Sequence, residues 1–469
     1  MIDSKAPGLK GSVWMRAAAE WNRWTGVSVN RGIFGAAVII AVFTVLAKFV
    51  SVAKDLVVAR IFGTSDAVDA FLIAFVLPSF AIAVVAGSLN NALIPVFVRV
   101  RQTGGRAAGQ RLLSNLTFVS VALLIGITVL LVALSPALLP LVGSGFAADK
   151  LSLTRSLYFL LLPTLVIYGL STTWSAVLNA DRRFVLAALA PGITPAITIA
   201  LVAGLGFRWG IFSVAAGTLA GFILEAALLG GALKRHGFSL LPRWHGFDPA
   251  TRQVIGQFAP LMSGALLMSS STVIDQSMAA LLGSGSVAAL NYGNKIVTFI
   301  LGVGSLAIGT AVLPFFSRMI AAGDWAGTRH TFYTYVRLLA ITTIPLTLLL
   351  VWLAEPLTRL IFERGNFTAN DTRVVSLVMI CFALQLPFYM AGIIGVRLLN
   401  ALGKGRPVML ICIVNMIANV VGNYVLMRKL GVAGIALSTA IVYLLSCAQV
   451  CYVVSTELQK REKTTNQHE

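Results

Sequence analysis

Four charged side chains interrupt a stretch of the chain that is otherwise apolar enough to lie in a membrane. Among the charged residues within 45–101, we single out Lys48, Lys54, Asp55 and Asp69. A charge at membrane depth is costly, so such a side chain usually faces a cavity or a charged partner and carries function. Lys48 and Asp55 are seven residues apart and therefore share one face of a helix. We predict that all four line a polar cavity within the membrane.

More local roles stay open for three of the four. Lys54 and Asp55 lie toward the outer end of their apolar segment, from which such side chains can reach water. Asp69 follows the turn at residues 63–66, so its carboxylate can also stabilise the first turn of its own helix. Lys48 has long apolar runs on both sides, and the cavity is therefore the best interpretation for this residue.

A second pair of charges lies in the other half of the chain. Asp275 and Lys295 are each embedded in an apolar segment, although Lys295 is near enough to the start of its segment to reach water. Together with Lys48 and Lys54, Lys295 would make the cavity cationic. A cationic chamber suits an anionic substrate, and ammonium groups bind phosphate oxygens well. We predict that the three lysines bind a pyrophosphate group, with Asp275 among the carboxylates of the same cavity.

A polar stripe runs along one face of a later segment. Asn415, Asn419 and Asn423 recur at every fourth position and so share a helix face, and Thr439 follows in the next segment. Their oxygen atoms could hold Na⁺ or gate the movement of protons, but hydrogen bonding between helices explains them as well. We predict no bound cofactor, and coupling to Na⁺, to H⁺ or to the membrane potential stays open.

The composition is that of a polytopic membrane protein. Of the 469 residues, 58% are hydrophobic and 11% are charged, whereas about a quarter of the residues of a soluble protein are charged. The net charge of +19 does not indicate nucleic-acid binding, because most lysines and arginines lie in short loops between apolar segments. There they set the orientation of the helices and contact anionic headgroups.

Signals for catalysis or for a metal site are missing from the sequence. It contains no GxSxG, Walker A or HExxH motif, and its four histidines lie in predicted loops or in the tail. The four cysteines lie in apolar helical stretches without a CxxC pair, which is typical of inert core residues. We therefore predict a transporter and not an enzyme.

Twelve apolar segments are long enough to cross a bilayer, which takes about 20 helical residues. They cover approximately residues 33–61, 67–98, 112–134, 152–178, 185–206, 210–233, 253–282, 286–317, 330–353, 371–399, 407–427 and 432–455. The first segment is longer than a ~30 Å hydrocarbon core requires, so it should tilt, bend or break. The second and eighth segments contain proline and glycine, which is typical of helices that line a transport cavity.

Positive charges predict the orientation of these segments. If the N-terminus is cytoplasmic, 24 lysines and arginines lie on the cytoplasmic side and nine on the opposite side, in agreement with the positive-inside rule. We predict that both termini are cytoplasmic. Residues 1–31 would form an amphipathic or disordered lead-in, residues 236–252 a cytoplasmic linker and residues 456–469 a cytoplasmic tail.

Several short motifs of the first half recur in the second half at a nearly constant offset in sequence number. The matching residues are Phe62-Gly63 with Leu282-Gly283, Leu93-Ile94-Pro95 with Val312-Leu313-Pro314, Leu178-Asn179-Ala180 with Leu399-Asn400-Ala401, Gly210-Ile211 with Gly431-Val432, and Thr218 with Thr439. Two sets of six helices with the same orientation predict two pseudo-symmetric lobes, residues 32–235 and 253–455. Transporters built from parallel repeats bind substrate between the lobes and alternate access by rocking.

Longer stretches resemble the MviN/MurJ family of murein lipid II flippases, within the MATE-like flippase superfamily. These stretches are KDLVVARIFGTSDAVDAFLIAFVLP (54–78), GSGSVAALNYGNKIV (283–297), AVLPFFSR (311–318), IFERGNFTANDT (361–372) and RLLNALGKGRPV (397–408). The resemblance implies an all-α, V-shaped transporter of the bacterial inner membrane, whose central cavity presents a polyprenyl-pyrophosphate-linked glycan to each face in turn. The partners that it implies are anionic membrane lipids and glycan polymerase or glycosyltransferase machinery.

The chain departs from the family pattern at its basic residues. Family members carry arginine where Lys48, Lys54 and Lys295 stand, so the charge is kept but the paired donors of guanidinium are lost. Residues 79–83, where the family has a basic pair, are uncharged here, and family members often have fourteen helices where we count twelve. The substrate is therefore either murein lipid II or another undecaprenyl-pyrophosphate-linked glycan, such as an exopolysaccharide or O-antigen repeat unit. Export of cationic drugs is a weaker alternative, because lysines repel cations, and a membrane scaffold would leave the buried charges without a role.

Overall fold

The computed structural model describes residues 29–181 and 183–466, and helices and their connecting turns make up these ranges. The elements are α2 (Val29–Phe62), α3 (Asp66–Val142), α4 (Ala148–Leu161), α5 (Pro163–Ala180), α6 (Phe184–Leu189), the 3₁₀ turn η1 (Ala190–Gly192), α7 (Ile193–Trp209), α8 (Phe212–Arg235), α9 (Pro249–Ala280), α10 (Ser286–Ala321), α11 (Trp325–Phe362), α12 (Ala369–Ala383), α13 (Leu386–Ala401), α14 (Gly405–Leu430) and α15 (Val432–Asn466). Eight helical stretches in the described part are long and apolar enough to cross a membrane. The prediction of an all-α polytopic membrane protein is confirmed.

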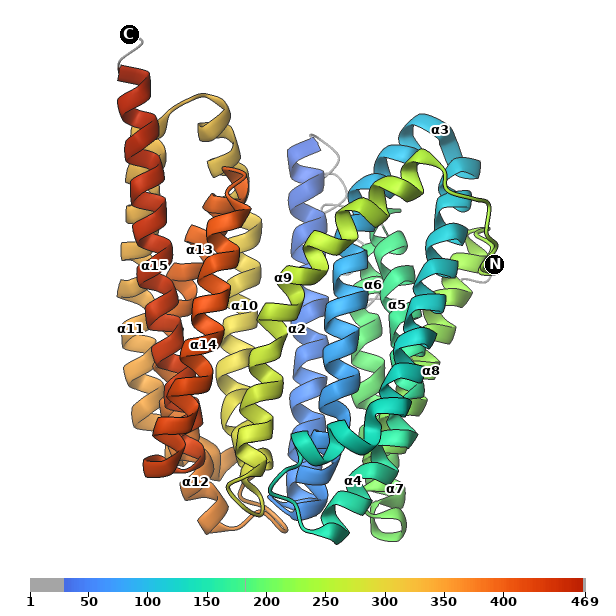
Figure 1. The fold of residues 1–469 in the computed structure, drawn as a ribbon, viewed down its shortest axis with the longest axis vertical. Coiled ribbons are helices and arrows are strands. Elements are labelled where there is room, and N and C mark those ends of the chain that lie inside the picture. Colours follow the sequence, from blue (N-terminus) through green and yellow to red (C-terminus); the bar gives the residue numbers. More distant parts are fainter. Residues whose placement is uncertain (1–28, 182, 467–469) are drawn as a thin grey trace, which may run out of the picture.

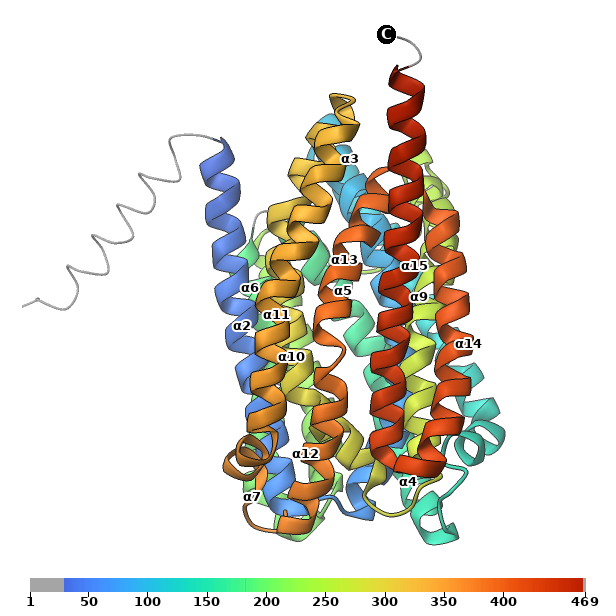
Figure 2. The ribbon, with the colours of Figure 1, turned by 90° about the vertical axis from the view of Figure 1, so that its left-hand side faces the viewer.

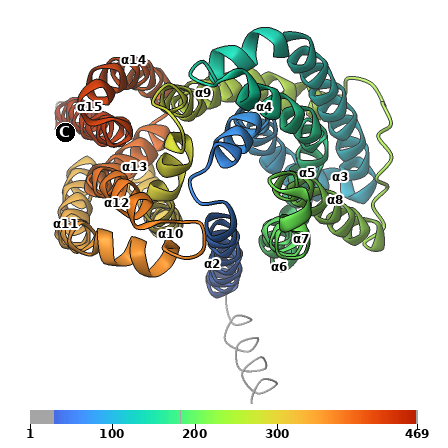
Figure 3. The same ribbon diagram turned by 90° about the horizontal axis from the view of Figure 1, so that it is seen from below.

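The helices form two lobes that stand side by side (Figure 1). Helices α2–α8 make up the N-lobe and α10–α15 the C-lobe, and the view from below separates the two (Figure 3). Helix α9 crosses between them, because Val254 and Phe258 pack into N-lobe cores whereas Asp275 is bonded to α14. The start of α2 and the end of α15 lie at the same end of the molecule (Figure 2). We call the opposite end, which holds the turn between α2 and α3, the turn end.

The internal repeat predicted from the sequence is present in the helices. α3 and α10 begin at Asp66 and Ser286, and α8 and α15 begin at Phe212 and Val432, so the two pairs have the same offset. Other N-lobe helices have counterparts at nearly that offset: α2 matches α9, α4 and α5 match α12 and α13, and the stretch from α6 to α7 matches α14. The two lobes are therefore two copies of one helical arrangement.

Two glycines show that the repeat extends to single backbone angles. Gly210 ends α7 with φ 52° and ψ −139°, and Gly431 ends α14 with φ 58° and ψ −137°. A side chain clashes with the backbone in this conformation, so glycine is the residue that can adopt it. Each glycine allows two long helices to follow one another with a very short connection.

The structure changes some of the predicted segment boundaries. The second and third predicted segments are the two arms of α3, which are separated by non-helical backbone at Gly105 (φ 70°, ψ −164°). This glycine lets the chain double back where the sequence indicated a loop (Figure 1). The break considered for the first segment is not found, since α2 is continuous over its described 34 residues.

Two later segments are interrupted at proline. α5 begins at Pro163 and α13 has Pro387 in its first turn, because proline cannot donate the backbone hydrogen bond that would continue the preceding helix. Residues 1–28 of the predicted lead-in lie outside the described residues.

Candidate functional site

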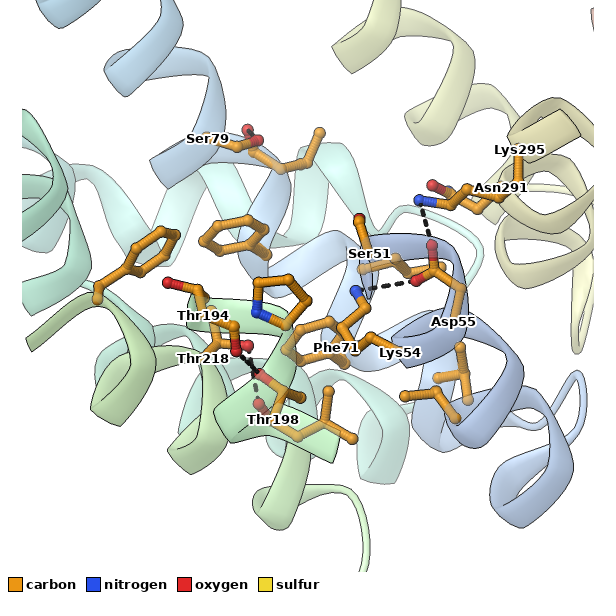
Figure 4. Close-up of a pocket in the computed structure, with 18 of the residues that line it drawn as sticks. Ser51, Lys54, Asp55, Phe71, Ser79, Thr194, Thr198, Thr218, Asn291 and Lys295 are labelled. Carbon is orange, nitrogen blue, oxygen red and sulfur yellow. Dashed lines mark hydrogen bonds and ion pairs between the residues drawn. The ribbon is translucent and has the colours of Figure 1, made fainter. Parts of the chain in front are cut away.

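A cavity of about 540 Å³ lies in the N-lobe at its border with α9 and α10. Its polar lining residues are Ser51, Lys54, Asp55, Ser79, Tyr168, Thr194, Thr198, Thr218, Glu225, Gln276, Asn291, Tyr292 and Lys295. Figure 4 shows the two lysines with Asp55 on one side and the three threonines on the other. The cavity thus joins a charged cluster at the lobe boundary to a neutral polar wall inside the N-lobe.

Asp55 holds two lysines that come from different lobes. Lys54 Nζ lies 2.9 Å from Asp55 Oδ1, and Lys295 Nζ of α10 lies 2.9 Å from Asp55 Oδ2. Asp55 is 6% exposed, whereas the Lys54 and Lys295 side chains are 23% and 32% exposed. Two ammonium groups against one carboxylate leave a net positive charge on the cavity wall. The structure thus brings together three of the predicted site residues.

The sequence of α2 explains how this cluster reaches the cavity. Ser51, Lys54, Asp55 and Val58 all line it, and their spacing of three, four and seven residues places them on one face of the helix. The neighbouring apolar positions of α2 point elsewhere, so a single helix presents a polar face within an apolar segment.

Lys48 does not line this cavity, which corrects the prediction of a single chamber with three lysines. Its ammonium group reaches across the lobe boundary to α10, where a methyl group added to Gly302 would lie 2.8 Å from Lys48 Nζ. The rings of Phe49 and Phe299, 5.0 Å apart, make the adjacent contact between α2 and α10. Lys48 is about 9 Å along α2 from Lys54, and glycine leaves the space that its side chain fills.

Asp69 also lies outside the cavity, and it caps a helix of the other lobe. The backbone amides of Gly285 and Ala288 donate to its two carboxylate oxygens, each at 2.8 Å, and Lys150 donates at 2.8 Å. Asp69 is fully buried. The sequence indicated a capping role at its own helix, but the first turn that it satisfies belongs to α10, where the partial positive charge of the helix N-terminus stabilises a carboxylate.

Further contacts between the lobes gather at the turn end. The Thr64 hydroxyl donates to Asp371 of the C-lobe. Asn366 donates through its backbone amide to the Arg60 carbonyl at 2.9 Å, and through its side chain to Ile61. We call Thr64 and Asp69 with their C-lobe partners Gly285, Ala288 and Asp371 the turn-end latch. It joins the two lobes at the end where the turn between α2 and α3 lies.

Asp275 belongs to a separate cluster inside the C-lobe and not to the cavity. Asn419 and Asn423 donate to its Oδ1 at 3.0 and 2.6 Å, and Thr439 lies 3.4 Å from its Oδ2. The side-chain carbonyl oxygens (Oδ1) of Asn419 and Asn423 are buried without a hydrogen-bond donor. Asn415 lies apart from Asp275 and, with Asn419 and Thr439, lines a second cavity of about 220 Å³.

The carboxylate of this cluster was missed because it comes from α9, far from the asparagines in sequence. The internal repeat contained the signal, since Asp275 follows Asp55 at the offset of the repeat. The same residue type at equivalent positions of two repeated helices indicates that both face a polar environment.

Glu225 is a cavity residue that the sequence analysis missed altogether. It lies on α8, is 3% exposed, and accepts a hydrogen bond from Thr194 Oγ1 at 3.0 Å. The rule applied to Lys48, that a lone charge in an apolar segment faces a cavity, would have identified it. Ile82 and Ala83 also line the cavity, at the place where the family resemblance leads one to expect a basic pair.

Comparison with known sequences identifies relatives over most of the chain. A family model described as "Lipid II flippase MurJ" matches residues 58–467. A "Probable lipid II flippase MurJ" from Synechocystis sp. is 27% identical over 449 residues, covering 92% of this chain and 83% of that protein. The "Lipid II flippase MurJ" of Burkholderia cenocepacia is 25% identical, covering 87% of this chain and 81% of its own.

Solved structures share the fold. A structure titled "Lipid II flippase MurJ, inward closed conformation" superposes with a TM-score of 0.76 and 22% identity over 90% of each chain. An inward-facing multidrug resistance MATE family transporter superposes with a TM-score of 0.71 and 13% identity, over 91% of this chain and 99% of that one. At these identities the likeness concerns the fold, which is the two-lobed, MATE-like arrangement.

The turn-end latch predicts unequal effects for two neighbouring carboxylates. Asp69→Asn places an amide group against a backbone N–H and removes a charge that caps α10, so we expect it to lower the free energy of unfolding by about 2–3 kcal/mol. Asp66→Asn is the matched control, because the Asp66 side chain is 58% exposed and its ion pair is with Lys150; its effect should stay below about 1 kcal/mol. Thermal unfolding followed by tryptophan fluorescence measures both, and equal shifts in Tm would contradict the capping role.

Proposed function

This chain belongs to the lipid II flippase MurJ family, and we infer that it moves lipid II, or a closely related undecaprenyl-pyrophosphate-linked glycan, from the inner to the outer leaflet of the bacterial cytoplasmic membrane. The proposal is one of transport and not of catalysis. Relatives named as lipid II flippases match most of its length, and the cavity chemistry suits a pyrophosphate group.

The observation that carries the proposal is the Lys54–Asp55–Lys295 cluster. Both lysines are partly exposed on the cavity wall, and ammonium groups bind phosphate oxygens through charge-assisted hydrogen bonds. A pyrophosphate that carries at least two negative charges competes with the single charge of Asp55 for both lysines. Its binding would therefore break the ion pair between Asp55 of α2 and Lys295 of α10. The two helices would then be joined through the bound pyrophosphate.

This exchange supports alternating access between two lobes. Asp55 and Lys295 join the lobes on one side of the membrane-spanning region, together with the turn-end latch. With both termini in the cytoplasm, as the distribution of lysine and arginine favours, the latch faces outward and the described conformation is closed toward the outside. Substrate would enter from the cytoplasmic side with its prenyl chain in lipid, and opening of the latch would release it outward.

Coupling to a cation is proposed at the cluster around Asp275. Its carboxylate, the Thr439 hydroxyl and the side-chain carbonyl oxygens of Asn419 and Asn423, which lack donors, are oxygen ligands of the kind that bind hard cations. The cluster lies on α9, the helix that crosses between the lobes, and on α14 and α15. A cation there would tie the position of α9 to that of the C-lobe.

A second glycan remains a candidate because of the cavity wall at Ile82 and Ala83. Both residues are uncharged and line the cavity, where the family resemblance leads one to expect a basic pair. A smaller cationic surface suits a substrate with fewer acidic groups than a murein precursor carries, such as an exopolysaccharide or O-antigen repeat unit. A multidrug substrate is disfavoured, because the lysine cluster repels cations.

Removal of either cavity lysine should weaken binding of a polyprenyl pyrophosphate. Loss of one charge-assisted hydrogen bond is worth about 1.5 kcal/mol or more, so Lys54→Ala and Lys295→Ala should each raise the Kd for undecaprenyl pyrophosphate by about tenfold or more. Lys404→Ala is the control, since Lys404 pairs with Glu457 away from the cavity. Binding to the purified protein in nanodiscs measures this, and unchanged affinity in both cavity variants would refute the site.

Cross-linking of the latch should stop transport reversibly. In a variant that lacks the four native cysteines, Thr64→Cys with Asp371→Cys places two thiols where a hydrogen bond now joins the lobes. Oxidation should form a disulfide and abolish glycan flipping, and reduction should restore it. Each single-cysteine variant serves as a control, and full transport by the oxidised pair would argue against opening at this end.

Depletion of the protein in its native cell should identify the glycan. We expect one undecaprenyl-pyrophosphate-linked precursor to accumulate in the inner leaflet, and mass spectrometry of extracted lipids distinguishes murein lipid II from another repeat unit. Complementation by the intact chain should clear the precursor, whereas Lys295→Ala, which lacks one of the cavity lysines, should fail to do so at a normal expression level. If no lipid-linked glycan accumulates, the proposed function is wrong.

A further inference from the structure

Glu225 is a buried carboxyl group on the cavity wall that the proposed pyrophosphate site does not use. It lies near the middle of the 24-residue helix α8, and Thr194 Oγ1 donates to it at 3.0 Å. α8 packs closely on α7 because Gly217 and Gly221 have no side chains, and a methyl group on either would lie under 3 Å from the Cα atom of Thr198 or Thr194. This packing holds Glu225 against Thr194 at the edge of the cavity.

The elements that pack against α8 present no cation to Glu225 in the described part of the chain. α5 contributes Tyr168 and α7 contributes Thr194, which are both uncharged. η1 has no titratable side chain. α4 packs against α8 as well, but its Lys150 is paired at the turn end and its Arg155 is exposed. Its Tyr158 donates to a backbone carbonyl of α3.

The cations on the far side of the cavity already have a partner. Lys54 and Lys295 are each 2.9 Å from an oxygen of Asp55, and neither forms an ion pair with Glu225 within the described residues. A carboxylate in an apolar interior with one neutral donor is less stable than the protonated acid. The surroundings of Glu225 therefore favour the protonated acid, whose hydroxyl can face the cavity.

The internal repeat adds an independent argument. Thr194, Thr198 and Thr218 in the N-lobe precede Asn415, Asn419 and Thr439 in the C-lobe by one constant offset. Two of these C-lobe residues, Asn419 and Thr439, contact a carboxylate, Asp275, which comes from the helix equivalent to α2. In the N-lobe the equivalent residue, Asp55, forms ion pairs with Lys54 and Lys295 instead. Glu225 supplies the carboxyl group that the threonine cluster would otherwise lack.

We propose that Glu225 is a proton-binding site whose occupancy is linked to that of an anionic substrate in the same cavity. When pyrophosphate is bound, a second negative charge nearby is unfavourable, and the protonated acid is the stable form. When the lysines lack the substrate, the positive cavity favours ionisation once water reaches Glu225. In that step the O–H bond of the carboxyl group breaks and the proton passes to water as hydronium on the open side; uptake is the reverse. The linkage to pyrophosphate rests on the proposed function, whereas the proton site itself does not.

Infrared spectroscopy of the full-length protein in nanodiscs reads the proton directly, without any ligand. The intact protein should show a C=O band of a protonated carboxyl group at low pH that fades as the pH is raised and that is missing in Glu225→Gln at every pH. Thr194→Val is the second variant, which keeps the acid but removes its donor, so the band should persist at a higher frequency. An identical carboxyl region in the intact protein and Glu225→Gln would overturn the proposal.

Binding of undecaprenyl pyrophosphate across a pH series tests the linkage. As pH rises, ionisation of Glu225 repels the anion, so the affinity of the intact protein should fall by at least about fivefold. Ionisation of the phosphate itself acts in the opposite direction, because it adds negative charge that the lysines attract. Glu225→Gln should bind as tightly as the intact protein does at low pH, and its affinity should not decrease as the pH rises. The control Glu457→Gln, which is remote from the cavity, should show the same decrease in affinity as the intact protein.

The outcomes separate this inference from the function on which it builds. If the infrared band is present but pyrophosphate does not bind at any pH, the proton site stands and the proposed substrate class fails. If Glu225→Gln weakens binding by the same factor at every pH, Glu225 merely positions the substrate and the proposed linkage is wrong.

Discussion

The cost of a charge inside an apolar membrane governs where the buried carboxylates of the described residues lie. Asp55 is held by two lysines, Asp69 by a lysine and two backbone amides, and Asp275 by two amide side chains and a hydroxyl. Each arrangement replaces the hydration that the group would have in water. Since the partners come from distant parts of the chain, satisfying these charges also fixes how the helices pack.

Two of these carboxylates have partners in the opposite lobe, so their stabilisation depends on the relative position of the two lobes. Asp69 can cap α10 only while the lobes are closed at the turn end, and Asp55 can hold Lys295 only while α2 and α10 lie side by side. An opening that separates these groups leaves charges without partners in the membrane. Water or an anionic substrate must then replace the lost partners, which is how ligand occupancy can bias the equilibrium between two lobe positions.

Hydropathy and the repeat were enough to predict the helices and the two lobes, because both are properties of local sequence. Gly210 and Gly431 recurred at the predicted offset with matching backbone angles. The sequence could also indicate that Lys54, Asp55 and Lys295 face a polar space. It could not reveal that Asp69 caps a helix of the other lobe, or that Lys48 fills the space at Gly302, since these contacts depend on how the lobes meet.

The two lobes show how one helical scaffold diverges in its chemistry. Asp55 and Asp275 occupy equivalent helix positions, yet one faces a lysine of the opposite lobe and the other faces asparagines of its own. The difference follows from what the neighbouring helices offer: α10 brings Lys295 to Asp55, and α14 brings Asn419 to Asp275. Because Asp55 is paired with the two lysines, the carboxyl group beside the cavity threonines is that of Glu225, which accepts a hydrogen bond from Thr194. A buried carboxyl group in each lobe, one on the wall of the cavity that Lys54 and Lys295 line and one among amides, therefore gives a pseudo-symmetric fold two unequal ionisable sites.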